Sequence, residues 1–95
     1  MPETTLTVRN PSGLHARPAA TFVRAAAGFA SEVQVTNLTR DPQRSASAKS
    51  VLGVMGLGVS SGHEIRLSTD GPDADEALET LSRLVESGIG EALEQ

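Results

Sequence analysis

Three segments of the chain alternate between apolar and polar residues, namely residues 4–9, 32–38 and 63–69. Successive side chains of a strand point to opposite faces of a sheet, so this alternation predicts strands with one buried face. A further short strand is expected within residues 44–48. Each of these strands brings an apolar face that needs a cover.

Apolar residues recur at helical spacing in the stretch that begins at Ala16. Four of them occupy positions i, i+3, i+4 and i+7 and so share one helix face: Ala19, Phe22, Val23 and Ala26. Gly28 follows this face, at a point where a glycine in left-handed geometry commonly ends a helix. The stretch therefore predicts an amphipathic helix that ends near Gly28.

Two later segments also predict helices. Residues 50–57 are apolar but contain two glycines, so we expect a weak helix that Ser50 caps and tertiary packing holds. The last helix is expected to begin at Asp73 and to end at Gly88. Asp73, followed three residues later by Glu76, resembles a capping box. The apolar stripe of this helix comprises Leu78, Leu81, Leu84 and Val85.

The expected order of elements is strand, helix, strand, strand, helix, strand and helix. Amphipathic helices supply the cover that one-sided strands need. The sequence therefore predicts an α+β fold, an open-faced two-layer sandwich whose four-stranded antiparallel sheet is covered on one face by three helices. The chain has 95 residues, and residues 1–95 are expected to form a single domain.

Composition narrows the classes of function. The chain has no cysteine and a formal net charge of −4. The first feature excludes disulfides and thiolate chemistry and suits a reducing compartment, and the second argues against nucleic acid as the main partner. We see no secretion signal and no apolar stretch of membrane-spanning length. We therefore expect a cytoplasmic protein without a metal or cofactor, bound to neither nucleic acid nor membrane.

The strongest chemical signal is the sequence GLHARP at residues 13–18. We expect His15 at the N-cap of the first helix, where free backbone N–H groups and the helix dipole favour an anion. Arg17 adds a guanidinium whose fork matches phosphate oxygens. An imidazole nucleophile, a cation and a helix N-terminus are the parts that phosphoryl transfer needs.

A plainer interpretation competes with this one, because an isolated histidine beside a turn is usually only an exposed polar residue. Against it, Arg17 places a positive charge where the helix dipole disfavours one, and such locally unfavourable choices often mark functional sites. The chain lacks a G-x-x-x-x-G-K-[ST] loop, so the phosphoryl donor is expected to be another protein rather than bound ATP. His63 is interpreted as an exposed strand residue without a functional role.

The sequence GLHARPAA at residues 13–20 resembles the active-site signature of the histidine-containing phosphocarrier family (HPr) of the bacterial sugar phosphotransferase system. AKSVLGVMGLG at residues 48–58 resembles the second signature of that family, and the similarity extends over residues 4–88. It implies that Nδ1 of His15 receives a phosphoryl group from enzyme I, which phosphoenolpyruvate phosphorylates, and passes it to the IIA component of a sugar permease. It further implies that Arg17 balances the phosphate charge in a monomeric carrier that is not an enzyme.

The second signature implies regulation and docking. Ser50 matches a serine that a dedicated kinase phosphorylates in many Gram-positive members, and a plain capping role is equally open for it. Val51, Leu52 and Met55 match an apolar docking surface for protein partners, and we expect Leu52 and Met55 to be the exposed pair. Residues 37–48 are longer than the tight turn usual in the family, which leaves the register of the third strand open.

Two other functions stay open at this point. A regulatory member of the same fold would bind its targets under the control of phosphorylation without passing the phosphoryl group on. A small-ligand-binding α+β module would leave His15 incidental to binding. Within the phosphocarrier interpretation, a nitrogen-regulatory or dihydroxyacetone-kinase branch is an alternative to sugar transport.

Overall fold

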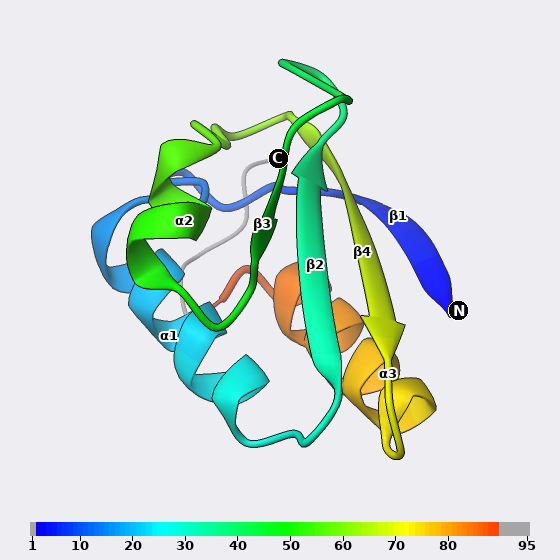
Figure 1. The fold of residues 1–95 in the computed structure, drawn as a ribbon. Coiled ribbons are helices and arrows are strands. Elements are labelled where there is room, and N and C mark those ends of the chain that lie inside the picture. Colours follow the sequence, from blue (N-terminus) through cyan, green and yellow to red (C-terminus); the bar gives the residue numbers. More distant parts are fainter. Residues whose placement is uncertain (1, 90–95) are drawn as a thin grey trace.

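The computed structural model describes residues 2–89. The strands in this part of the chain are β1 (Glu3–Thr7), β2 (Glu32–Asn37), β3 (Ser45–Ser47) and β4 (Glu64–Asp70). The helices are α1 (Ala16–Ala27), α2 (Val51–Gly56) and α3 (Ala74–Glu86). This succession of elements is the one that the sequence predicts (Figure 1).

The strands form one sheet in the order β1-β4-β2-β3, and every neighbouring pair is antiparallel. Val35 of β2 lies opposite Ala46 of β3 and Leu67 of β4, which fixes the register of the third strand. The helices cover one face of the sheet and leave the other open (Figure 1). The predicted open-faced α+β sandwich is confirmed. Among residues 2–89, no helix is long and apolar enough to cross a membrane.

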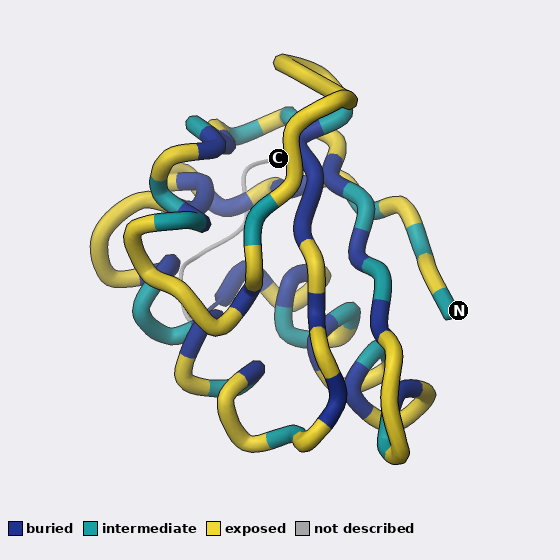
Figure 2. The backbone as a smooth tube through the Cα atoms, in the orientation of Figure 1, coloured by how far each residue is buried: buried dark blue, intermediate teal, exposed yellow. Residues whose placement is uncertain are grey.

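The core lies between the sheet and the helices, and it contains the apolar faces that the sequence pattern indicates. Phe22 of α1 is fully buried, as are Val35 and Leu67 of the sheet and Leu81 of α3. Along β2 the chain alternates between exposed and buried residues over its first half (Figure 2). Each fully buried aliphatic or aromatic side chain of this kind stabilises the fold by roughly 1.5–3 kcal/mol.

The C-terminal ends of α1 and α3 are made differently. Gly28 has φ −75°, a right-handed value, so the prediction of left-handed geometry is wrong there. Its N–H bonds to the carbonyl oxygen of Ala25 and the N–H of Phe29 to that of Ala26, so α1 ends without a left-handed glycine. Gly88 has φ +90°, and the N–H of Ile89 bonds back to the carbonyl oxygen of Leu84, so α3 ends at a left-handed glycine as expected.

The N-terminus of α3 is joined to the start of β2. Asp73 is the N-cap residue, but its side chain makes no capping hydrogen bond, so the predicted capping box is wrong. Its carboxylate accepts instead from the hydroxyl and the N–H of Ser31, which lies 42 residues away, and from the N–H of Ala30. The hydrogen bond from the Ser31 hydroxyl, followed by that from Ala30, lowers the pKa of Asp73.

Candidate functional site

The loop that precedes α1 is fastened to the segment that follows α2. The N–H of Leu14 donates to the carbonyl oxygen of Val59 over 3.0 Å, and the side-chain amide of Asn10 donates to the carbonyl oxygen of Gly13 over 2.8 Å. Gly13 has φ +57°, and a Cβ there would stand 2.3 Å from the carbonyl oxygen of Val59. Only glycine permits this approach. His15 therefore follows a loop whose path is fixed by its contacts with Val59.

His15 occupies the N-cap position of α1 with its side chain exposed. Its backbone is extended (φ −111°, ψ 152°), and its imidazole makes no capping hydrogen bond to the first turn. Ala16 has φ +44°, a left-handed value that costs a residue other than glycine about 1–2 kcal/mol. The chain thus enters α1 through a strained residue and leaves the usual capping interaction unmade.

Arg17 lies in the first turn of α1, which contains no acidic residue. Among residues 2–89 the only ion pair joins Arg83 to Glu79, so no described carboxylate lies within 4.0 Å of the Arg17 guanidinium. The side chain is exposed. A permanent positive charge at this helix end interacts unfavourably with the helix dipole unless an anion binds beside it.

His15 and Arg17 occupy the N-cap and the first turn of α1, as the sequence predicts, and both line one shallow depression. The depression has a volume of about 340 Å³ and is lined by Ser12, His15, Ala16, Arg17 and Pro18. It brings a nucleophilic ring, a guanidinium and a helix N-terminus to one surface. These groups suit a phosphoryl group, whose transfer depends on positioning and on charge stabilisation.

The start of α2 is fixed by two hydrogen bonds. The Oγ of Ser50 accepts from the N–H of Gly53 over 3.0 Å, which confirms the predicted cap. The ammonium group of Lys49 donates to the carbonyl oxygen of Phe29 over 2.7 Å and ties α2 to the end of α1. Ser50 remains exposed in this arrangement, and α2 lies beside α1 (Figure 1).

The exposed apolar pair on α2 differs from the predicted one. Leu52 is 84% exposed, as expected, but its companion is Val51, which is 38% exposed. Met55 packs against the core instead. The reason is the direction of the helix, because residues 49–52 are all exposed whereas Val54, Leu57 and Val59 are buried, so α2 begins at the surface and its later residues approach the core.

His63 is a structural joint rather than the exposed strand residue that the sequence suggested. It is half-buried and precedes β4. Its Nδ1 atom lies 3.2 Å from the N–H of Ser60 and 3.1 Å from the side-chain amide of Asn37. A backbone N–H can only donate, so Nδ1 of His63 accepts and the ring joins the start of β4 to the end of β2.

Comparison with known proteins places this geometry in a family. Residues 2–87 match the family model described as "PTS HPr component phosphorylation site". The chain is 42% identical over 86 residues to the phosphocarrier protein HPr of Lysinibacillus sphaericus, which covers 90% of this chain and 93% of that protein. It is also 42% identical over 87 residues to the multiphosphoryl transfer protein of Haemophilus influenzae, covering 92% of this chain and only 17% of that protein.

Solved structures agree with the sequence relatives. The structure of HPr from Thermoanaerobacter tengcongensis is 44% identical, with a TM-score of 0.89 and coverage of 98% of this chain and 100% of that one. A structure described as an HPr dimer from the same organism gives a TM-score of 0.72 at 44% identity, with coverage of 96% and 100%. The chain belongs to the HPr family, the phosphocarrier proteins of the phosphotransferase system.

Proposed function

We propose that this protein relays a phosphoryl group from phosphorylated enzyme I to a IIA protein and that His15 is the residue that carries it. The supporting observation is the N-terminus of α1, where an exposed imidazole and an arginine without a described carboxylate partner line one depression. Residues 1–95 act in this proposal as one HPr-like domain. It is a cytoplasmic, monomeric carrier rather than an enzyme, and it needs no metal or cofactor of its own.

The transfer step uses groups that the chain already holds in place. A lone pair of the His15 imidazole, on Nδ1 in this proposal, attacks the phosphorus, and a nitrogen–phosphorus bond forms as the bond from phosphorus to the donor breaks. Arg17 and the first-turn N–H groups of α1 balance the charge on the phosphoryl oxygens. The reverse sequence of bond changes delivers the group to the acceptor protein.

Docking and regulation complete the proposal. Val51 and Leu52 offer the exposed apolar contact to enzyme I and IIA proteins, with Met55 supporting them from the edge of the core. Ser50 is exposed at the N-terminus of α2, where an added phosphate would suit the helix and alter the charge of the docking surface. We propose it as the target of a serine kinase and phosphatase.

Intact-mass analysis after incubation with the cognate enzyme I, Mg²⁺ and phosphoenolpyruvate tests the carrier role. We expect one added phosphate that is lost in acid, is absent from His15→Ala, and is retained by His63→Ala as the matched histidine control. A wild-type protein that takes up no phosphate would overturn the proposal. A phosphorylated protein that transfers nothing to IIA proteins would favour the regulatory alternative instead.

A further inference from the structure

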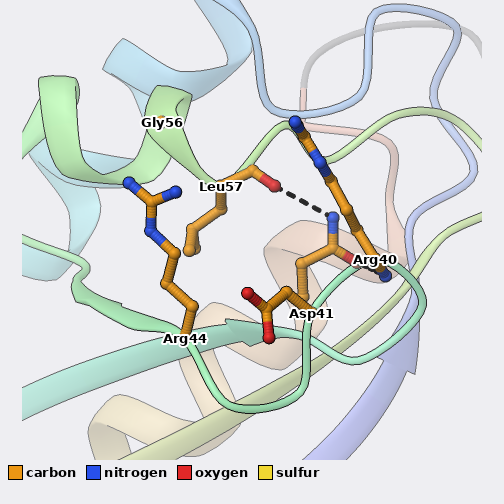
Figure 3. A pocket seen from close by; sticks show the side chains of 6 residues that line it. Arg40, Asp41, Arg44, Gly56 and Leu57 are labelled. Atoms are coloured by element: carbon orange, nitrogen blue, oxygen red, sulfur yellow. Dashed lines mark hydrogen bonds between the residues drawn. The ribbon is translucent and has the colours of Figure 1, made fainter.

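A second cluster of positive charge lies away from His15, in the connection between β2 and β3. Two arginines of this connection stand on opposite sides of a small hollow beside the C-terminal end of α2 (Figure 3). The hollow has a volume of about 190 Å³ and is lined by Asn37, Arg40, Asp41, Arg44, Gly56 and Leu57. It shares no lining residue with the depression around His15.

The frame of the hollow is rigidly hydrogen-bonded around Asn37, which is 1% exposed. The side-chain amide of Asn37 donates to the carbonyl oxygen of Leu57 over 3.1 Å and contacts Nδ1 of His63. Its Oδ1 accepts from the N–H of Arg40, and its backbone carbonyl oxygen accepts from the N–H of Asp41. The loop that carries the arginines is therefore anchored to a buried side chain.

The two guanidinium groups lie near the glycines that end α2 and follow it. A Cβ built on Gly58 would lie 1.7 Å from Nη1 of Arg40, so this guanidinium lies against the bare backbone there. A Cβ on Gly56 would lie 3.9 Å from Nη2 of Arg44. Within residues 2–89, neither arginine has an ion-pair partner.

Asp41 is the carboxylate that lines the hollow, and it lies between the two arginines (Figure 3). One of its oxygens accepts from the N–H of Gln43 over 3.1 Å. The two guanidinium groups and this carboxylate leave a net positive charge at the hollow. An anion entering it would meet the guanidinium donors of Arg40 and Arg44 and one opposing charge from Asp41.

We propose that the Arg40–Arg44 hollow binds the phosphate group of a small molecule. A carboxylate is planar and pairs fully with a single guanidinium fork, whereas a tetrahedral oxyanion presents oxygens in several directions and can join two forks that approach from opposite sides. The volume suits one such group rather than a whole nucleotide. The alternative to phosphate binding is that water alone solvates both arginines.

The hollow lies close in the chain to the segment that supports the loop of His15, so binding in the hollow has a route by which it can affect His15. Leu57 lines the hollow, and Val59, two residues on, holds the loop of His15 through the N–H of Leu14. A bound phosphate would thus neutralise positive charge beside Leu57, two residues before the residue that holds the loop of His15. This binding proposal does not depend on the proposed carrier function.

Amide chemical shifts in ¹H–¹⁵N spectra test this site directly. Titration with inorganic phosphate, against chloride at equal ionic strength, is run on an Arg17→Ala background so that binding beside His15 is weakened. We expect saturable shifts at Arg40, Arg44 and residues 56–58. The double variant Arg40→Ala/Arg44→Ala should bind about tenfold or more weakly, since each lost bond is charge-assisted.

Two further variants and one further probe sharpen the result. Arg40→Lys/Arg44→Lys keeps the charge without the forks and should fall between the wild type and the alanine variant. Asp41→Asn removes the opposing charge and should tighten binding. Shifts that are absent, or unchanged in the alanine variant while its spectrum stays dispersed, would overturn the proposal. Acetate binding as tightly as phosphate would also overturn it, in favour of a carboxylate from a protein partner.

Discussion

The N-termini of α1 and α3 are built from opposite choices. At α3, Asp75 and Glu76 occupy the first turn and complement the helix dipole, and Asp73 is hydrogen-bonded to the start of β2. At α1, the first turn holds no acid and Arg17 brings a positive charge, while neither His15 nor Asp73 makes a side-chain capping hydrogen bond. The dipole of α3 is therefore complemented by acidic residues of the protein itself, whereas the dipole of α1 is not.

This difference indicates where the molecule gives up stability for function. A cation at the N-terminus of α1 forgoes the roughly 0.3–1 kcal/mol that an acidic residue contributes at such a position, and the left-handed geometry of Ala16 costs about 1–2 kcal/mol more. A phosphoryl group on His15 would supply the negative charge that α1 lacks. In our account the phosphoryl group supplies the negative charge at the N-terminus of α1, whereas acidic side chains already supply it at α3.

The largest change in stability is expected at the α3 end. Asp73→Ala removes the acceptor of three hydrogen bonds from Ala30 and Ser31, so its free energy of unfolding should fall while phosphoryl uptake stays unchanged. Urea unfolding of the variant and of Asp75→Asn, a control that also loses one charge at this helix end, measures the difference. If Asp73→Ala were as stable as this control, the hydrogen bonds of Asp73 would not stabilise the N-terminus of α3.

The same residue predicts a dependence on pH. The pKa of Asp73 is lowered in the folded protein, so its stabilising contribution is present above the ordinary value of 3.8 and is lost as the pH falls through the lowered value. The gap in unfolding free energy between wild type and Asp73→Ala should therefore narrow in that acidic range. Urea titrations at neutral and acidic pH measure it, and a constant gap would contradict the assignment.

A smaller loss is expected at the N-terminus of α2, which is capped like an ordinary helix. Ser50→Ala removes the acceptor of the Gly53 N–H and should lower the free energy of unfolding by about 1 kcal/mol. Ser50→Asp keeps an acceptor there and should retain most of the stability, while its charge slows transfer from enzyme I. Thermal unfolding and transfer rates are read on both variants. Equal transfer by Ser50→Asp and wild type would argue for a plain capping role.

Arg17→Glu exchanges the dipole-opposing charge of α1 for a favourable one. Stability should rise by about 0.3–1 kcal/mol, whereas phosphoryl uptake by His15 should fall sharply because a cation beside the phosphate has become an anion. Arg24→Glu, at the other end of the same helix, is the charge-matched control and should change uptake far less. Uptake that is equal in the two variants would show that only net charge matters.

The smallest change in stability is expected on the exposed face of α2. Leu52 is 84% exposed, so Leu52→Glu should leave the free energy of unfolding within about 0.5 kcal/mol of wild type. It should nevertheless weaken docking, seen as a raised KM for enzyme I. An unaltered KM would remove Leu52 from the docking surface. The buried Val54 is unsuitable for this test because its replacement alters the core.

The elements of the fold were predictable because their signals are local. The four-residue apolar stripe around Phe22 and the alternation through Val33 and Val35 depend on residues a few positions apart, and all of these side chains are buried. The role of Asp73 could not be read in this way, because its partner Ser31 lies 42 residues away and sequence alone offered the nearer Glu76.

In the candidate site, too, the residues that could be predicted are close in sequence, and those that could not are brought together only by the fold. His15 and Arg17 stand two residues apart at a helix start, so their nearness could be predicted, and the structure adds that both line one depression. Arg40 and Arg44 lie in a connection without regular spacing, and only the fold brings them to the end of α2. The exchange of Met55 for Val51 on the exposed face depends on where a six-residue helix meets the core.

The central claim is that the open end of α1 is the place where the phosphoryl group is carried. The most direct test is a ¹H–¹⁵N spectrum that includes the imidazole nitrogens, recorded before and after phosphorylation by enzyme I. We expect large shifts at the His15 ring and at the amides of Ala16 and Arg17, with the His63 ring unchanged. Shifts centred on His63, or a phosphorylated protein with an unchanged His15 ring, would contradict the account.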